Sequence, residues 1–378
     1  MMNKQVRIII SGGGTGGHIF PAISIANAIR ELCPDSEILF VGAEGRMEMQ
    51  RVPQAGYEIK GLPIMGFDRK NLLKNFKVLY KVWKSQRMAK RIIKTFKPMV
   101  AVGVGGYASG PTLNKAADMG IPCLIQEQNS YAGVTNKLLA KKAQKICVAY
   151  EGMERFFPAD KIMLTGNPVR QDLFDTKLTR EEALKSFGLP TNKKTVLIMG
   201  GSLGARTLND SVLQNLELIR KHDDVQFIWQ TGKYYYEQMD SIMQSRGFTH
   251  DDPSCNIVWT DFLDMRAGYR AADIVVSRAG ASSISEMCLL GKPVILVPSP
   301  NVAEDHQTKN AMALVDRQAA IYVKDSEAPS RLIRTALDCV EDAALLESLS
   351  ENIRKMALPN SARIIAQEVL KLCDNRKA

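Results

Sequence analysis

A dense glycine-rich turn that ends in a histidine is the first segment of the chain that could do chemistry. It reads Ser11-Gly12-Gly13-Gly14-Thr15-Gly16-Gly17-His18 and follows an apolar run at 6–10. Glycines after a strand let backbone N–H groups approach a phosphate at the start of a helix, where the helix dipole favours negative charge. The turn also contains a formal GxGxxG pattern, so a dinucleotide site with Glu44 on a ribose is one interpretation.

Two further turns of small residues follow apolar runs in the second half of the chain. Gly200-Gly201-Ser202-Leu203-Gly204 comes after 195–199, and a dinucleotide-dependent dehydrogenase would need only one such turn. Ser277-Arg278-Ala279-Gly280-Ala281-Ser282-Ser283-Ile284-Ser285-Glu286 comes after 273–276, and the N–H groups at its helix start could hold a diphosphate. Glu286 could accept two ribose hydroxyls, or it could form a capping box with Ser283.

The elements that must position these turns are short strands alternating with helices. Continuous apolar runs predict strands buried on both faces, and therefore parallel sheets covered by helices. The predicted strands are 6–10, 37–42, 99–104, 122–126, 145–149, 195–199, 225–230, 256–259, 273–276, 293–298 and 320–323. Because the strand–turn–helix pattern restarts near residue 195, we predict an α/β fold with two Rossmann-like, doubly wound domains facing a cleft.

This restart also predicts the domain boundaries. We expect an N-terminal domain at 1–168, a C-terminal domain at 169–345 and a C-terminal helix at 346–378. Gly166-Asn167-Pro168-Val169-Arg170 and the polar stretch after it lie at the junction.

The composition is that of an ordinary globular protein, with 378 residues, 45% hydrophobic and 24% charged. Its seven cysteines are widely spaced and form no CxxC pair, which argues against a disulfide framework or a zinc site and for a reducing compartment. No apolar run approaches the roughly 18–20 residues of a membrane span, and no signal-peptide pattern precedes the first strand. We therefore expect a cytoplasmic location.

Basic residues are concentrated in the first half of the chain. Residues 1–170 contain 25 Lys/Arg and 12 Asp/Glu, whereas the remainder contains 25 and 28. Eleven of the Lys/Arg lie in 69–97, and they include Lys77, Lys81 and Lys84. One face of the helix predicted there carries Leu72, Phe76, Leu79 and Trp83. A basic amphipathic helix with aromatic residues favours an anionic membrane surface, although the apolar stripe could instead pack in the core. Since no nucleic-acid-binding motif accompanies the charge, we expect no nucleic-acid partner.

Six motifs, taken in order, carry a family resemblance. They are Gly13-Gly14-Thr15-Gly16-Gly17-His18, Gln126-Glu127-Gln128-Asn129, Gly166-Asn167-Pro168-Val169-Arg170, Gly200-Gly201-Ser202-Leu203-Gly204-Ala205, Arg278–Glu286 and Glu304-Asp305-His306-Gln307-Thr308-Lys309-Asn310-Ala311. Over almost the full chain, the set resembles the bacterial peptidoglycan glycosyltransferases that add N-acetylglucosamine to lipid I. The resemblance implies the two-domain B-type glycosyltransferase fold. The N-terminal domain would face the acceptor and the membrane, the C-terminal domain would bind the UDP-sugar, and the last helix would pack back on the N-terminal domain.

The resemblance also implies the reaction. N-acetylglucosamine would pass from UDP-N-acetylglucosamine to the C4 hydroxyl of the muramoyl sugar of lipid I, an undecaprenyl-diphospho-linked acceptor, with inversion at the anomeric carbon. The products would be lipid II and UDP. The enzyme would use no cofactor, lie peripherally on the cytoplasmic face of the bacterial inner membrane, and serve peptidoglycan synthesis, cell shape and division alongside other cell-wall synthesis proteins. The alternatives are another lipid-linked glycosyltransferase or a UDP-sugar epimerase, in which the basic amphipathic segment would have no purpose.

Position by position, the resemblance assigns a substrate-binding set. Its members are Thr15, Gly16, Gly17, Asn129, Arg170, Ser202, Leu263, Ala281, Ser282, Ser283, Glu286 and Gln307. Leu263 would contact the uracil through its backbone, and Glu286 would hold the ribose hydroxyls. Ser283 stands where many members have Thr, and Leu203 stands where many have Gln, so only Leu203 lacks a polar group.

The transfer chemistry needs a general base and a means of stabilising the departing diphosphate. His18 is the base candidate that we favour because imidazole titrates near working pH, although it could instead bond a backbone group at a helix start. Glu127 is a second candidate base. The N–H groups at 281–286, helped by Arg170 or Ser202, would stabilise the diphosphate, and we predict no metal site.

Overall fold

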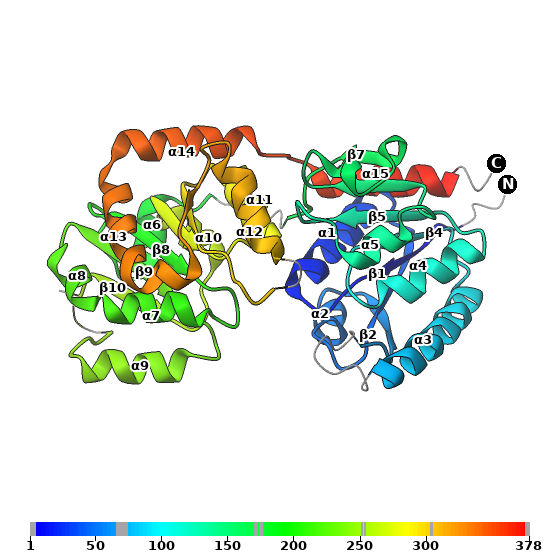
Figure 1. Cartoon of the computed structure of the whole chain (residues 1–378), viewed down its shortest axis with the longest axis horizontal. Coiled ribbons are helices and arrows are strands. Elements are labelled where there is room, and N and C mark those ends of the chain that lie inside the picture. Colours follow the sequence, from blue (N-terminus) through cyan, green and yellow to red (C-terminus); the bar gives the residue numbers. More distant parts are fainter. Residues whose placement is uncertain are drawn as a thin grey trace. The chain divides into compact units, whose positions relative to one another are not determined.

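The structure is a computed structural model that describes residues 5–65, 75–169, 173, 177–250, 252, 255–302 and 305–374, with 75–77 described by their backbone alone. The chain divides into two compact units. Unit 1 comprises Met1–Arg170 and Leu358–Ala378, and unit 2 comprises Gln171–Ala357 (Figure 1). Each unit is described by itself below.

Unit 1 is built on a seven-stranded parallel sheet in the order β3-β2-β1-β4-β5-β6-β7. Its strands are β1 (Arg7–Ser11), β2 (Glu37–Ala43), β3 (Glu58–Leu62), β4 (Val100–Gly103), β5 (Cys123–Glu127), β6 (Lys145–Val148) and β7 (Ile162–Leu164). Its helices are α1 (Gly16–Leu32), α2 (Glu48–Gln54), α3 (Asn75–Phe96), α4 (Ser109–Asp118), α5 (Val134–Leu139) and α15 (Ser361–Asp374).

Successive residues of β1 show how this sheet builds two cores. Ile8 and Ile10 pack with α1 and α15 on one face, whereas Ile9 packs with α3 and α4 on the other. Side chains alternate between the faces of a strand, so a continuous run of isoleucine fills both layers at once.

Unit 2 is built on a six-stranded parallel sheet in the order β10-β9-β8-β11-β12-β13. Its strands are β8 (Lys194–Met199), β9 (Val225–Gln230), β10 (Ile257–Thr260), β11 (Ile274–Ser277), β12 (Val294–Leu296) and β13 (Ile321–Tyr322). Its helices are α6 (Arg180–Ser186), α7 (Arg206–Gln214), α8 (Leu216–Lys221), α9 (Tyr236–Ser245), α10 (Met265–Ala271), α11 (Ala281–Leu290), α12 (His306–Val315), α13 (Ala328–Glu341) and α14 (Ala343–Lys355).

The strand order reverses beside the first strand of each sheet. β1 lies between β2 and β4, and β8 lies between β9 and β11. In doubly wound sheets, ligands bind outside the carboxyl ends of the strands at such a switch point. The turns after β1 and β4, and those after β8 and β11, are therefore where the fold places a site in each unit.

The two doubly wound, parallel α/β units confirm the predicted fold of each domain, and every predicted strand is present to within two residues at either end. The prediction missed β3 and β7, which form the two edges of the unit 1 sheet. β3 is buried only at its last residue, and β7 has no buried residue. Edge strands of this kind lack the continuous apolar run on which the prediction relied.

The last segment differs from the single helix expected at 346–378. The structure has two helices, α14 in unit 2 and α15 in unit 1, with Pro359 and Asn360 between them. Proline cannot continue a helix, and Asn360 adopts a left-handed φ of 62°. α15 packs along α1, whereas α14 contacts α11 and α13.

In the part of the chain that the structure describes, no helix combines the length and the apolar character needed to cross a membrane. All seven cysteines are free thiols, and five of them are buried. Burial raises the pKa of Cys123, Cys147 and Cys288 to about 12. These thiols are therefore protonated and unreactive at neutral pH.

Candidate active site

A buried carboxylate holds the first glycine-rich turn in place. Glu48 of α2 is fully buried, and its Oε2 accepts a hydrogen bond from the Gly14 N–H at 3.0 Å. Its Oε1 accepts another from the Ala43 N–H at the end of β2, also at 3.0 Å. One N–H group that was expected to face a phosphate is thus occupied by a negative charge, which disfavours an anion at that point of the turn.

Glycines make room for this arrangement. A Cβ on Gly13 would lie 2.1 Å from Glu48 Oε1, so no side chain fits there. From the neighbouring strand β4, Gly106 approaches with a φ of 83°, and a Cβ on it would lie 2.2 Å from the Gly13 carbonyl oxygen. The turn after β1 and the turn after β4 therefore pack backbone against backbone.

His18 lies in the first turn of α1 and points back at this loop. Its Nδ1 lies 3.1 Å from the Gly13 carbonyl oxygen and 3.2 Å from Thr15 Oγ1. Since a carbonyl can only accept, we assign the ring proton to Nδ1, which leaves the basic lone pair of the neutral ring on Nε2. The ring lies against Gly105, where a Cβ would be 2.9 Å from Nε2. The backbone bond expected of a helix-start histidine is therefore present, and the role of His18 as a base stays a prediction.

Glu127, the second candidate base, has its acceptor capacity filled. It ends β5 and is 2% exposed. Oε1 accepts from the backbone N–H and the side-chain amide of Asn129, at 3.1 and 3.3 Å, and Oε2 accepts from the Gly133 N–H and Asn136 Nδ2, both at 2.9 Å. A carboxylate offers about four acceptor positions, so four donors leave no lone pair for a substrate proton. The geometry favours His18 as the base and gives Glu127 the work of holding Asn129.

Two of the sequence motifs form one buried polar network at the same edge of the sheet. Gln126 Nε2 donates to Asn167 Oδ1 at 3.0 Å, and Asn167 Nδ2 donates to the Gln128 carbonyl oxygen at 3.0 Å. Gln128 Nε2 donates to the Val104 carbonyl oxygen at 2.9 Å. Arg170, which follows this motif, lies outside the described residues.

The switch point of unit 2 contains a hollow of about 650 Å³. Gly200, Gly201 and Gly204 of the second glycine-rich turn line one side, and Gly280 and Ser283 at the start of α11 line another. α7 and α11 both begin here after Ala205 and Gly280, and within the described residues no side chain caps either start. Helix starts with uncapped N–H groups are suited to bind a diphosphate.

The charges around this hollow are basic and partly compensated. Arg278 forms an ion pair with Asp325 and donates to the Val297 carbonyl oxygen at 3.0 Å. Asp325 also accepts from Thr207 Oγ1 at 3.2 Å. Arg206, in contrast, is an exposed residue of the lining. The Arg278–Asp325 ion pair forms part of the wall of the hollow. Arg206 is exposed, so its guanidinium could move toward a ligand.

Of the other predicted residues of unit 2, Gln307 is in the lining of this hollow. Its Oε1 accepts from the Ser299 N–H at 2.8 Å, which leaves its amide nitrogen as the donor for a ligand. Leu263 has a buried side chain, so only its backbone is available to a ligand. Ser202 is exposed within the glycine-rich turn, and Ala281 is buried at the start of α11. Ser282 Oγ is buried and has no partner among the described residues.

Glu286 lies farther along α11 and does not cap it. Its Oε2 accepts from the Tyr269 hydroxyl at 3.0 Å, and the residue is 9% exposed. The cap of α11 is Gly280, so the alternative of a Ser283–Glu286 capping box is wrong.

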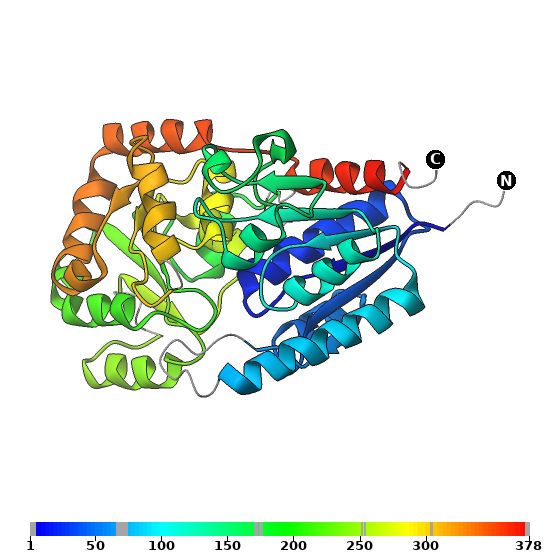
Figure 2. The same cartoon turned by 45° about the vertical axis from the view of Figure 1, so that its right-hand side comes forward.

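The predicted basic helix is present as α3, which lies along the outside of unit 1 (Figure 2). Leu79 and Trp83 are 56% and 54% exposed, so this part of the apolar stripe does not pack in the core. Ser85, Ala89 and Ile93 form the buried face of the helix instead. Lys84 is exposed and Lys81 half-buried. Leu72 and the side chains of Phe76 and Lys77 lie outside the described residues.

Aromatic and basic groups meet on the exposed side of α3. The Tyr80 and Trp83 rings stack with their centroids 6.2 Å apart, and Tyr80 is 61% exposed. The Arg87 guanidinium lies 5.0 Å from the centre of the Trp83 ring. Such a surface is unusual for a face in contact with water alone.

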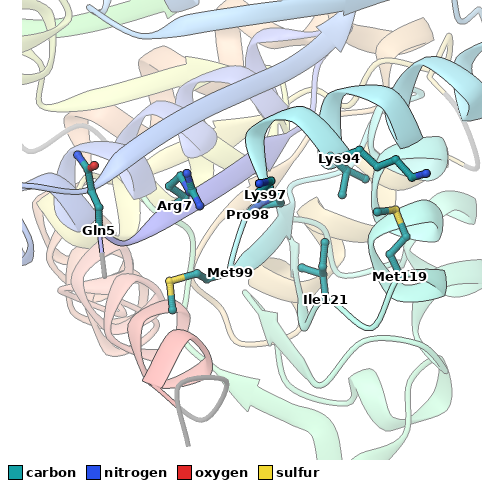
Figure 3. Close-up of a pocket in the computed structure, with 9 residues that line it drawn as sticks. Gln5, Arg7, Lys94, Lys97, Pro98, Met99, Met119 and Ile121 are labelled. Carbon is teal, nitrogen blue, oxygen red and sulfur yellow. The ribbon is translucent and has the colours of Figure 1, made fainter. Parts of the chain in front are cut away.

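A second hollow, of about 390 Å³, lies at the amino end of the unit 1 sheet (Figure 3). Arg7 of β1 and Lys94 and Lys97 from the end of α3 line it, together with Met99, Met119 and Ile121. Ligands of doubly wound sheets bind at the opposite, carboxyl edge, so we do not assign the reaction to this hollow.

Sequence reasoning missed three features of the two sites. Gly103-Val104-Gly105-Gly106-Tyr107 follows a predicted strand, and its glycines were the available signal. No local sequence pattern indicated the roles of Glu48 and Asp325. Gly14, which donates to Glu48, and Arg278, which pairs with Asp325, lie 34 and 47 residues away in the chain.

Two family models match the chain. The glycosyltransferase family 28 N-terminal domain matches residues 8–148, and the glycosyltransferase family 28 C-terminal domain matches residues 195–367. Together they cover both switch points described above.

Named relatives match at high identity. A Bacteroides thetaiotaomicron protein is 67% identical over 374 residues, 99% of each chain, and a Porphyromonas gingivalis protein is 55% identical over 377 residues, 99% of this chain and 98% of its own. Both are called UDP-N-acetylglucosamine–N-acetylmuramyl-(pentapeptide) pyrophosphoryl-undecaprenol N-acetylglucosamine transferase.

Solved structures match in fold. MurG of Acinetobacter baumannii superposes with a TM-score of 0.73 at 26% identity, covering 97% of this chain and 99% of that one. The UDP-GlcNAc 2-epimerase of Neisseria meningitidis superposes with a TM-score of 0.66 at 16% identity, covering 97% and 100%, and at that identity the likeness concerns the fold alone.

Proposed function

Because the chain belongs to glycosyltransferase family 28, we propose that it transfers N-acetylglucosamine from UDP-N-acetylglucosamine to the undecaprenyl-linked acceptor lipid I, forming lipid II and UDP. The observation that carries this proposal within the structure is the hollow of unit 2, where the starts of α7 and α11 and a glycine-rich turn surround a space of about 650 Å³. The product is the precursor of peptidoglycan, so the reaction serves the bacterial cell wall.

The donor would bind in unit 2. Its diphosphate would lie at the starts of α7 and α11, where backbone N–H groups and the helix dipoles stabilise the charge that develops as UDP departs. Ser283, which lines the hollow, and its neighbour Ser282 would add hydroxyl donors, and Arg206 would add a positive charge. Glu286 would accept the ribose hydroxyls, and Gln307 would donate its amide nitrogen to the sugar.

The acceptor would be activated in unit 1. His18 Nε2 would remove the proton of the C4 hydroxyl of the muramoyl sugar while that oxygen attacks the anomeric carbon from the side opposite UDP. A single displacement of this kind inverts the anomeric carbon. Asn129, held by Glu127, and the turn at Thr15–Gly17 lie at the same edge of the sheet and would bind the reacting sugars.

The exposed face of α3 would hold the enzyme on an anionic membrane, where the lipid tail of the acceptor resides. Leu79, Tyr80 and Trp83 would enter the headgroup region, and the basic residues around them would each add about 1 kcal/mol near anionic lipid. The enzyme would then lie peripherally on the inner membrane, at its cytoplasmic face.

The reaction is tested with purified protein, radiolabelled UDP-N-acetylglucosamine and a short-chain lipid I analogue, with a chelator present. We expect label in the lipid fraction in proportion to the acceptor. Among the described residues, no three His, Cys, Asp or Glu side chains gather in a way that could hold a metal ion, and the chelator tests this directly. Acceptor-independent conversion of the donor to another UDP-sugar would overturn the proposal in favour of an epimerase.

The membrane face is tested by sedimentation with vesicles of anionic or zwitterionic lipid. Leu79→Asn combined with Trp83→Asn should abolish most of the binding to anionic vesicles. The matched control is Leu138→Asn, because Leu138 of α5 is 76% exposed but is not on α3. Equal binding by the α3 variant and the control would contradict this assignment.

A further inference from the structure

One peptide group joins two ionisable side chains in unit 1. The carbonyl oxygen of the Gly13–Gly14 peptide accepts from His18 Nδ1 at 3.1 Å, and the N–H of the same peptide donates to Glu48 Oε2 at 3.0 Å. The two bonds lie on opposite sides of one planar unit, so charge on Glu48 polarises the amide toward the imidazole. Glu48 and His18 come from different helices, α2 and α1.

The carboxylate is buried in a space made for it. Glu48 is 0% exposed, and within the described ranges no Lys or Arg pairs with it. Two glycines surround it: a Cβ would lie 2.1 Å from Oε1 at Gly13 and 2.6 Å from Cγ at Gly42. A buried charge is costly unless its hydrogen bonds are strong, so both N–H donors to this carboxylate are important to the unit.

We propose that Glu48 is the positioning residue of His18, acting through the Gly13–Gly14 peptide. This rests on the proposed function, in which His18 is the base. Glu48 fixes the peptide so that its carbonyl receives the Nδ1 proton, which keeps the basic lone pair on Nε2. When Nε2 takes the proton of the acceptor hydroxyl, the imidazolium is stabilised by the carboxylate through the polarised amide. A carboxylate does the same for the histidine of a serine protease by direct contact.

Among the residues that the structure describes, the neighbouring titratable groups Glu127, Glu44 and Tyr107 do not share this peptide. Glu127, after β5, is saturated by its own loop. Glu44, after β2, lies against Gly61 of β3, and Tyr107, after β4, is 52% exposed. Glu48 is therefore the carboxylate whose charge reaches His18 through a defined pair of hydrogen bonds.

The test compares Glu48→Gln with Glu48→Asp in the lipid I assay, over a pH series. Glu48→Gln should lower kcat about 10- to 100-fold, as loss of an oriented base does. Because the carboxylate stabilises the imidazolium, its removal should also move the acid limb of the kcat/KM profile to lower pH by about half a unit. Glu48→Asp keeps the charge, so its acid limb should stay closer to that of the wild type.

Two controls separate positioning from mere support of the fold. Glu368→Gln removes another buried carboxylate of unit 1, on α15, and should leave the acid limb in place. In a His18→Ala background, Glu48→Gln should cause less than about a twofold further loss of single-turnover rate, because coupled residues are not additive.

Three outcomes decide the proposal. An unmoved acid limb in Glu48→Gln, or an equal loss of rate with and without His18, would overturn it and make Glu48 a structural residue only. If Glu48→Gln does not fold, Glu48→Asp is the variant to test. A Glu48→Asp enzyme with the wild-type kcat but a shifted acid limb of the kcat/KM profile would contradict the proposal. Absence of transfer by the wild-type protein would instead refute the proposed function.

Discussion

The two glycine-rich turns occupy the same place in their sheets, but they surround different things. The turn after β1 is filled by the Glu48 carboxylate, which takes the Gly14 N–H and leaves no room for a side chain at Gly13. The turn after β8 borders the hollow of about 650 Å³, and a Cβ on Gly201 would meet nothing within 4 Å. Both turns also pack backbone against backbone, Gly13 on Gly106 and Gly204 on Gly232, so they differ in the buried carboxylate of unit 1 and in the hollow beside the turn of unit 2.

Glycines after a strand therefore indicate that another group packs close to the backbone. They do not indicate whether that group belongs to the protein or to a ligand. In unit 1 the approaching group is the protein itself, since Glu48 and the Gly105–Gly106 turn pack on the loop. In unit 2 the backbone at Gly232 packs on Gly204, whereas Gly201 borders the hollow, which has basic residues at its wall. We expect substitutions in the first turn to impair catalysis, and substitutions in the second to impair donor binding.

The largest effect should come from His18→Ala. Removing the proposed base should lower kcat by about 10²- to 10⁴-fold, while the affinity for UDP, whose proposed site is in unit 2, should stay unchanged. Transfer assays and calorimetric titration with UDP measure the two quantities. His222→Ala is the control, because His222 follows α8 in unit 2 and its Nδ1 lies 2.9 Å from the Leu218 carbonyl oxygen of that helix. A weakened UDP affinity in His18→Ala would contradict the assignment of catalysis to the first turn and donor binding to the second.

A matched pair of glycine substitutions tests the contrast directly. Gly13→Ala forces a methyl group against Glu48 and should lower the stability of unit 1 by about 1–3 kcal/mol. Transfer activity should also fall, because the Gly13 carbonyl oxygen that accepts from His18 would be displaced. Gly201→Ala meets open space, so its cost is that of a residue at φ 85°, about 1–2 kcal/mol, and its methyl group should weaken donor binding. Denaturant unfolding and UDP titration distinguish them. Equal changes in stability and in UDP affinity for both variants would show that the two turns have the same function.

Glu286→Gln should act on donor binding alone. Loss of a charge-assisted hydrogen bond to ribose should weaken UDP binding about 10-fold, with little effect on 2′-deoxy-UDP, which lacks one of the hydroxyls. Tyr269→Phe removes the hydroxyl that bonds Glu286 and serves as a milder comparison. Similar losses for both nucleotides would argue that Glu286 supports α11 instead of binding ribose.

The smallest functional effect is expected at the opposite end of α11. Burial lowers the pKa of Lys292 from 10.5 to about 8, partly offset by Asp273, while its Nζ donates to the Ala272 carbonyl at 2.7 Å. The unfolded chain therefore keeps this proton up to a higher pH than unit 2 does, so the free energy of unfolding should rise as pH increases from about 8 to 10.5.

Lys292→Met should remove that rise without changing the affinity for UDP. Relative to the wild type, the variant should lose about 2–3 kcal/mol of stability between pH 7 and 10.5, at about 1.4 kcal/mol per pKa unit. Chemical unfolding at several pH values measures the slope. An unchanged slope would mean that the lysine keeps its proton in the fold, and a changed UDP affinity would extend the donor site to both ends of α11.

The predicted and missed strands show how far the sequence alone reaches. Central strands such as β1, β8 and β11 are continuous apolar runs, because both faces of each are covered by helices. β3 and β7, at the sheet edges, are partly exposed and carry no such run. Pattern therefore identified the middle of each sheet and, with it, the switch points at which the turns lie.

The sequence alone predicted the central strands of both sheets, the positions of the small-residue turns, and the place of His18 beside the first turn. These depend on neighbours in the chain, through side-chain periodicity and backbone sterics. Only the tertiary structure decided that Glu48 fills the first turn, that Glu127 is saturated by its own loop, and that Asp325 fixes Arg278. Hydrogen bonds and ion pairs between segments far apart in the sequence depend on which strands become neighbours in the sheet. A local sequence pattern does not specify those neighbours.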